Sequence, residues 1–256
     1  MNQRIERAYE NRPKNWVFEA SVAVVFLALL VWSASAVETS GTTQNGGKIA
    51  VNILKGIFQP DTKLLFNLTV QGVPYLLLET ICIAFLGTVV GAIISIPLAF
   101  LSASNLTPKP VAFIGRIIIM AIRTVPPFIY GLMFVRVTGP GAFAGLLTMS
   151  LCSVGMVSKM YIEAIEDLDT RVLESLDAAG CSAWQKIRYG ILPQLMPNFA
   201  STAIYRFDIN LRDATVLGLV GAGGIGAPLI FAMNAYRWNE AGAILAGLIV
   251  LVLIVE

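Results

Sequence analysis

Long apolar runs, each about the length needed to cross a bilayer, alternate along this chain with short polar connections. A helix needs roughly 20 apolar residues to span a hydrocarbon core of about 30 Å. The windows that meet this requirement are residues 17–36, 75–101, 111–135, 142–165, 197–220 and 239–256. Apolar residues recur within them at helical spacing, without the alternating ten-residue strands of a membrane barrel. The pattern predicts an all-α integral membrane protein with six transmembrane helices.

Composition agrees with this interpretation. The chain is 56% hydrophobic and 13% charged, whereas soluble domains are roughly a quarter charged. The net charge is +2, and the basic residues are spread among helix ends and loops, so no nucleic-acid partner is expected. The predicted environment is the lipid bilayer.

The distribution of Lys and Arg gives an orientation. One side holds Arg4, Arg7, Arg12, Lys14, Lys109, Arg171, Lys186 and Arg188, and the other holds Lys48, Lys55, Lys63 and Arg237. Cytoplasmic loops carry the excess of positive charge. We therefore expect the N-terminus and the polar region around Glu174 to be cytoplasmic.

Two regions are expected along the chain. Residues 1–74 would hold a cytoplasmic segment, the first helix and an external connection with an amphipathic stretch at 49–58. The basic start and Ala34-Ser35-Ala36 mimic a cleaved signal, but the basic region is long for one, so the first helix is expected to be retained. Residues 75–256 would form a five-helix core with a cytoplasmic insert at 166–195.

The insert carries the signals of two short helices. Ala178-Ala179-Gly180 closes the first, because Gly adopts the left-handed conformation that ends a helix. Ser182 stands three residues before Gln185, which forms an S-x-x-Q capping box, and an apolar stripe that includes Trp184 follows. An ordinary capped helix-Gly-helix loop remains the alternative for this segment alone.

The fifth predicted helix contains charges that are costly in a membrane. They lie in YRFDINLRDATVLGLV and comprise Arg206, Asp208, Asn210, Arg212 and Asp213. Each charge costs about 2.5–3.5 kcal/mol at a helix centre, so we expect them to be paired. Helical spacing places Asp208 beside Arg212, and Arg206 near Asp213 by way of Asn210.

Two interpretations of these charges stay open. They could merely neutralise one another inside the bundle, or one stripe could fix the helix while the other lines a polar translocation path. In the second case Arg212 with Asp208 is expected to be the structural pair. Arg206 would then face a passing anion, with Arg123 nearby in the third predicted helix, which Pro126 and Pro127 must kink or break.

Two glycine patterns were also considered. Gly221, Gly223, Gly224 and Gly226 lie in a run that matches G-x-G-x-x-G, but it follows a membrane helix and has no βαβ context, so a glycine-rich gate loop at the external helix end is expected instead of a dinucleotide site. The GxxxG at 87–91 predicts tight helix packing, with self-association as the alternative.

Catalysis by this chain is not expected. It contains no His, and no G-x-x-x-x-G-K-[ST] phosphate-binding loop is present. Cys82 and Cys152 lie within predicted spans and Cys181 in the insert, so no pair suggests a disulfide or a zinc site. We expect no catalytic residue, no metal site and no cofactor bound by this chain.

The quoted segments together resemble the phosphonate-type permeases of ABC importers. The resemblance covers about residues 70–256 and rests on PYLLLETICIAFLGTVVGAIISIPLAFLSA, IRTVPPFIYGL, the insert and TVLGLVGAGGIG. Glu174 and Gly180 occupy the signature positions of the family's "EAA" coupling motif, while Ser175 and Leu176 replace its alanines and Gly190 stands where isoleucine is usual.

This resemblance implies a type I importer fold in the bacterial inner membrane. It also implies a second permease copy, two cytoplasmic ATPases that hold ATP and Mg²⁺, and an extracytoplasmic protein that delivers phosphonate, phosphite or phosphate. The residues expected to contact the ATPase are Glu174, Ala178, Ala179, Gly180, Ser182 and Trp184.

Other functions remain as alternatives. A permease for methionine or a quaternary ammonium compound would not need several intramembrane arginines. An ion-coupled secondary transporter predicts internal repeats and helices broken at the midplane, and no internal repeat is visible. A membrane enzyme is disfavoured because His and metal-spaced carboxylates are absent.

Overall fold

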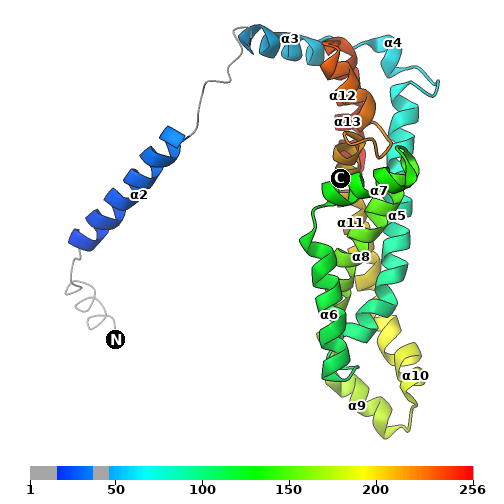
Figure 1. Ribbon diagram of the computed structural model, residues 1–256. Coiled ribbons are helices and arrows are strands. Elements are labelled where there is room, and N and C mark those ends of the chain that lie inside the picture. The colour runs from blue at the N-terminus through cyan, green and yellow to red at the C-terminus, as the bar shows by residue number, and fades with distance from the viewer. Residues whose placement is uncertain (1–15, 37–45, 256) are drawn as a thin grey trace, which may run out of the picture. The chain divides into compact units, whose positions relative to one another are not determined.

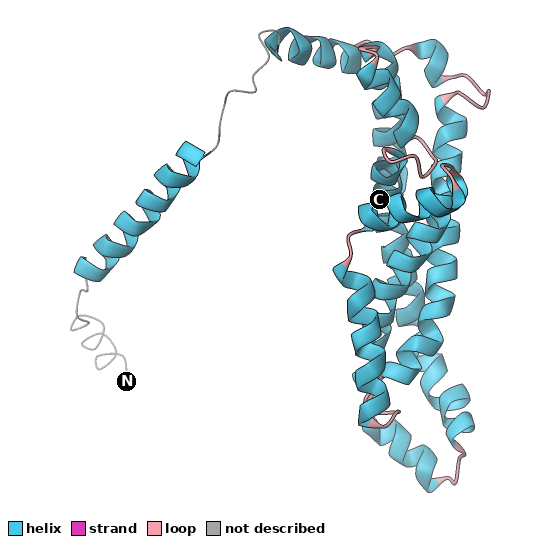
Figure 2. Ribbon diagram, viewed as in Figure 1, coloured by secondary structure: helices cyan, strands magenta, loops and turns pink. Residues whose placement is uncertain are grey.

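The computed structural model describes residues 16–36 and 46–255, and all regular structure among them is helical (Figures 1 and 2). The chain divides into two units, residues 1–50 and 51–256. The first unit contains α2 (Trp16–Ala36), an apolar helix without a distinct polar face. Its 21 residues are enough to span a membrane.

The second unit contains most of the helices. Their order is α3 (Gly46–Phe58, which begins in the first unit), α4 (Thr62–Leu65), α5 (Val73–Ser102), α6 (Lys109–Thr124), α7 (Pro127–Thr138), α8 (Ala142–Glu166), α9 (Thr170–Ala178), α10 (Ala183–Gln185), a π-helical turn (Lys186–Ile191), α11 (Leu192–Gly218), α12 (Gly226–Asn234) and α13 (Trp238–Val255). The predicted all-α membrane fold is confirmed by these elements.

The six predicted spans are matched only in part. Among the described residues, α2, α5, α8 and α13 are long and apolar enough to cross a membrane. The span expected at 111–135 is instead two helices, α6 and α7, bent by 84°. Val125 is extended ahead of Pro126, and Pro127 opens α7, because proline disfavours helical geometry in the residue before it.

The fifth expected span corresponds to α11, which begins earlier than predicted. Its 27 residues are long enough for a crossing, but α11 is not among the described helices that are both long and apolar enough to span a membrane. The helix starts at Leu192, ahead of the expected 197, with Pro193 in its first turn, where a missing N–H is tolerated. The short helix α12 was not predicted.

Helices α5 and α8 form a closely packed pair in the bundle. A Cβ at Gly91 would lie 2.4 Å from the Cβ of Ser153 and 2.9 Å from the carbonyl oxygen of Ser150. Gly87 approaches Met149 equally closely. Because membrane helices associate through small residues that bring backbones together, the GxxxG serves packing within the chain, as predicted.

The glycine-rich loop lies against the same pair of helices. Gly221, Gly223 and Gly224 have positive φ, and the N–H of Ile225 donates to Oγ1 of Thr80 at 3.0 Å. A Cβ at Gly224 would lie 2.7 Å from that oxygen. The loop therefore requires glycine both for its backbone conformation and for its contact with α5.

Candidate functional site

The two-helix insert lies at one end of the bundle, opposite α4 (Figure 1). Its first helix, α9, begins after Asp169, whose carboxylate accepts from the N–H of Arg171 at 3.0 Å. At its end the N–H of Cys181 donates to Leu176 O at 3.0 Å and that of Gly180 to Asp177 O at 2.9 Å. These are the two bonds of a Schellman motif, and Gly180 takes the left-handed φ of +73°.

The second helix of the insert begins with the predicted capping box. The N–H of Ser182 donates to Oε1 of Gln185 at 2.8 Å, and the N–H of Gln185 donates to Oγ of Ser182 at 3.4 Å. An ion pair between Lys186 and Asp177 joins the two helices. The insert is thus held in one conformation by local bonds.

Gly190 also contributes to the insert. It is buried, and a Cβ there would lie 2.2 Å from Cδ1 of Leu176, so Leu176 would have to move for a larger residue to fit. The departure from isoleucine at this position therefore has a packing reason in this chain.

The outer surface of the insert is exposed. Glu174, Ala178, Ala179 and Ser182 are exposed, and Trp184 is 68% exposed. An indole and a carboxylate presented on a rigid support are suited to contact another protein. The structure brings these predicted coupling residues together on one projection.

A π-helical turn connects the insert to α11 without a break, which was not predicted. The N–H of Leu192 donates to the carbonyl of Ile187, five residues back. Pro193 follows and cannot donate to the preceding turn. Such turns are frequent at functional sites, and this one makes the insert and the charged helix continuous.

The charged stripes of α11 differ in exposure. Nη2 of Arg212 donates to Oδ2 of Asp208 at 2.7 Å, with side chains 50% and 28% exposed. The expected pairing of these two residues is confirmed. Their stripe lies on an outer face of the unit, which also carries exposed Tyr205 and Ser201.

Arg206 lies on the inner face. It is 5% exposed, its Nε donates to Oγ of Ser153 at 3.3 Å, and Nη1 lies 3.2 Å from the sulfur of Met156. Its Nη2 is 4.0 Å from Oδ2 of Asp213, which confirms that pairing at the limit of an ion pair. Arg206 is thus buried and Arg212 exposed, whereas the sequence led us to expect that Arg206 faces a passing anion and that Arg212 is the structural residue.

Asn210 does not bridge Arg206 and Asp213, and this part of the prediction is wrong. Its Nδ2 donates to Thr88 at 2.8 Å and to Ser153 at 2.7 Å. These hydroxyls belong to α5 and α8, whose approach at Gly91 brings both within reach of α11. The inner stripe therefore joins three helices through buried polar contacts.

Arg123 lies in the last turn of α6 and is exposed. A Cβ at Gly155 would lie 2.9 Å from Cγ of Arg123, so the arginine stem packs directly on α8. Gly155 lies within one turn of Ser153 and Met156, which Arg206 contacts. Arg123 and Arg206 are therefore at a similar level along α8.

These features define a multi-pass membrane transport subunit: apolar helices around a polar centre, with a rigid exposed insert at one end. The chain matches the family of the binding-protein-dependent transport system inner membrane component over residues 95–255, and it belongs to that family. It is accordingly a multi-pass protein of the inner membrane. The family expected from the sequence is confirmed.

Two relatives are themselves transport permeases. The chain is 35% identical to the phosphite transport system permease protein PtxC of Stutzerimonas stutzeri, over 94% of this chain and 86% of that protein. It is 38% identical to the phosphate-import permease protein PhnE of Mycolicibacterium smegmatis, over 69% of this chain and 34% of that protein.

A solved structure shares the fold. The MetNI methionine ABC transporter in an inward-facing conformation aligns with a TM-score of 0.61 at 23% identity, over 70% of this chain and 87% of that one. The expected importer permease fold is confirmed by this likeness.

Proposed function

We propose that this chain is the permease subunit of an ATP-powered importer for phosphorus oxyanions such as phosphite, phosphonate or phosphate. The observation that carries the proposal is the similarity, over nearly the whole chain, to a permease described as a phosphite transporter. Guanidinium groups within the membrane region fit this substrate class, because Arg presents planar donors to oxyanions.

The outer stripe of α11, which contains Asp208 and Arg212, is the proposed lining of the translocation path. A charged pair such as Asp208–Arg212 cannot face lipid at low cost, so its exposed face must meet water or another protein. Exposed Asn198, Ser201 and Tyr205 continue this polar face along the helix. Arg212 is the anion-facing group in this proposal.

The inner stripe has a different proposed role. Arg206, Asn210 and Asp213 belong to the path region but fasten α11 to α5 and α8. The donors of Arg206 and Asn210 are already engaged with Ser153, Thr88 and Met156, and Asp213 pairs with Arg206. Arg123, exposed on α6, is a further proposed contact for the anion. This assignment replaces the one expected from sequence.

Energy for transport comes from a partner in this proposal. Two cytoplasmic ATPases hold ATP and Mg²⁺, and the surface formed by Glu174, Ala178, Ala179, Gly180, Ser182 and Trp184 inserts into a groove on each ATPase. The chain itself hydrolyses nothing. The N-terminus lies in the cytoplasm, on the side of the insert.

Two copies of the chain complete the path. A C2 dimer places the same polar face of each α11 toward a common axis and removes it from lipid. The glycine-rich loop at 221–226 forms part of the external gate, where an extracytoplasmic binding protein delivers the anion.

The first selection of substrate belongs to the binding protein, so the proposal is tested there. Calorimetric titration of the partner binding protein should show tight binding of phosphite, phosphate or a phosphonate. Methionine and glycine betaine serve as controls for the runner-up function. Tight binding of either control, with no oxyanion bound, would contradict the proposed substrate class.

A further inference from the structure

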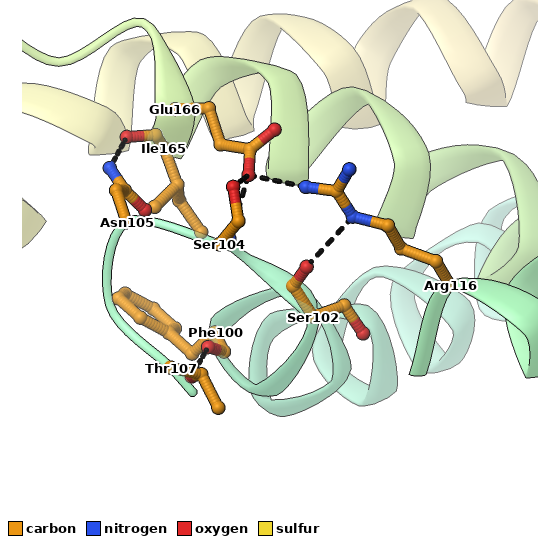
Figure 3. Close-up of polar contacts among 8 residues, drawn as sticks. All are labelled: Phe100, Ser102, Ser104, Asn105, Thr107, Arg116, Ile165 and Glu166. Carbon is orange, nitrogen blue, oxygen red and sulfur yellow. Dashed lines mark hydrogen bonds and ion pairs between the residues drawn. The ribbon is translucent and has the colours of Figure 1, made fainter. Parts of the chain in front are cut away.

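Beyond the coupling surface itself, one polar cluster joins the base of the insert to a different part of the permease (Figure 3). It lies where α8 ends at Glu166, and residues 167–169 lead from there directly into α9. The other side of the cluster is the turn between α5 and α6, which includes Ser104 and Asn105. Nothing in the coupling motif predicts this connection.

Glu166 is the centre of the cluster. Its Oε1 accepts from the N–H of Ser104 at 2.7 Å and from Oγ of the same residue at 2.5 Å, and it forms an ion pair with Arg116 of α6. Beside it, Nδ2 of Asn105 donates to the carbonyl of Ile165 at 2.8 Å. One carboxylate therefore contacts both the α5–α6 turn and α6.

Arg116 extends the connection to a second helix end. Its Nε donates to the carbonyl of Ser102, the last residue of α5, at 3.1 Å. A Cβ at Gly115 would lie 2.2 Å from Oγ of Ser102, so α6 crosses close to this helix end. Arg116 thus binds the end of α5 and the end of α8 at once.

The electrostatics favour this arrangement. A helix C-terminus carries partial negative charge and unpaired carbonyls, which makes it an unfavourable place for a carboxylate and a favourable one for an arginine. Arg116 supplies the favourable positive charge at the ends of α5 and α8, and its charge-assisted contact compensates the unfavourable carboxylate of Glu166. Leu168 and Ile187 pack on the same apolar core as Leu106 and Phe100.

We propose that Glu166 is a positioning residue for energy coupling, which together with Arg116 fixes the insert to the α5–α6 turn so that movement of the insert moves α6. The helix that moves with it carries Arg123 in its last turn and ends at Thr124, just before the bend at Pro126. The inference rests on the proposed function in that it assumes a partner ATPase that pulls on the insert.

The test uses the complete complex of permease, ATPase and binding protein, with the binding protein purified together with its native cargo. The variants are Glu166→Gln, which removes the charge but keeps the size, and Arg116→Lys, which keeps the charge but loses the Nε donor. The control is Glu163→Gln, one turn earlier on α8, whose carboxylate pairs with Lys159 of the same helix. The readout is the ratio of ATPase rates with and without the binding protein.

Wild type and Glu163→Gln should show the same stimulation. Because coupling between sites is typically about 5–150-fold, we expect the stimulation to fall about five-fold or more in Glu166→Gln and Arg116→Lys complexes of normal subunit composition. A merely structural role would lower both rates in proportion and leave the ratio unchanged, which would overturn the proposal. If the Glu166→Gln permease does not assemble with the ATPase, the ratio of ATPase rates measured for Arg116→Lys decides whether the proposal holds.

Uptake of phosphite is measured separately on the wild type. The same assay is run with phosphate and a phosphonate. Stimulated ATP hydrolysis without uptake of any of the three oxyanions would contradict the proposed substrate class, while the stimulation ratios would still decide the role of Glu166.

Discussion

Gly180 is the residue whose role depends most clearly on backbone conformation. Its φ is +73°, and no atom lies within 4 Å of a Cβ placed there, so a substitution is strained without any steric clash. A left-handed conformation costs an L-residue about 1–2 kcal/mol. We expect Gly180→Val to reshape the turn between α9 and α10, and the ATPase subunits to dissociate during purification.

Gly180→Asn is the matched control, because Asn tolerates the left-handed region. It should retain the ATPase in size-exclusion chromatography. An intact, fully coupled complex from Gly180→Val would show that the turn between α9 and α10 does not support the contact with the ATPase.

The two charged stripes of α11 can be separated by neutral double variants. Asp208→Asn/Arg212→Gln should fold normally but lower uptake at least about ten-fold, because a hydrogen bond to a charged group contributes about 1.5–3 kcal/mol. Arg206→Met/Asp213→Asn should lower the yield and thermal stability of the folded permease instead. Uptake per folded transporter and unfolding in detergent are the measurements, and the opposite pattern would restore the roles first expected from sequence.

Local contacts at the residue scale were predictable. The capping box and the Asp208–Arg212 pair each join residues within four positions, so spacing alone indicates them. The left-handed conformation of Gly180 was indicated by a glycine at the end of a predicted helix. The burial of Arg206 was not predictable, because it depends on Ser153, which lies 53 positions away. Which face of a helix is inward is decided by its neighbours.

At the scale of elements, the sequence located most apolar helices and one of their interruptions. Pro126 and Pro127 were expected to kink or break the third predicted span, and the 84° bend between α6 and α7 confirms an interruption there. The π-helical turn at Lys186–Ile191 and the short α12 had no signal strong enough to predict them. Their geometry depends on packing against the rest of the bundle.

The packing of α5 on α8 gives a prediction for an element. A Cβ at Gly91 would lie 2.4 Å from the Cβ of Ser153, so Gly91→Val must push the helices apart. Overpacking typically costs about 1–3 kcal/mol. It should also displace Thr88 and Ser153 from Asn210, which lowers thermal stability in detergent.

Val90→Ile is the control for this substitution, since Val90 immediately precedes Gly91 in the same helix and is exposed. It should unfold at the wild-type temperature. Equal stability of the two variants would mean that the α5–α8 contact is looser than the structure shows.

For the whole molecule, the exposed Asp208–Arg212 face predicts a second copy. Two differently tagged copies of the chain, expressed together with the ATPase, should be recovered in one complex, and native mass spectrometry should give two permeases and two ATPases. A complex that holds one copy of this chain, alone or beside a different permease, would contradict the symmetric dimer.

Uptake by the reconstituted importer tests the central claim most directly. Vesicles containing the permease and ATPase should accumulate labelled phosphite, phosphate or a phosphonate only when ATP is present on the ATPase side and the binding protein on the other. Accumulation driven by an ion gradient without ATP, or uptake of methionine or glycine betaine with no oxyanion transported, would contradict the account.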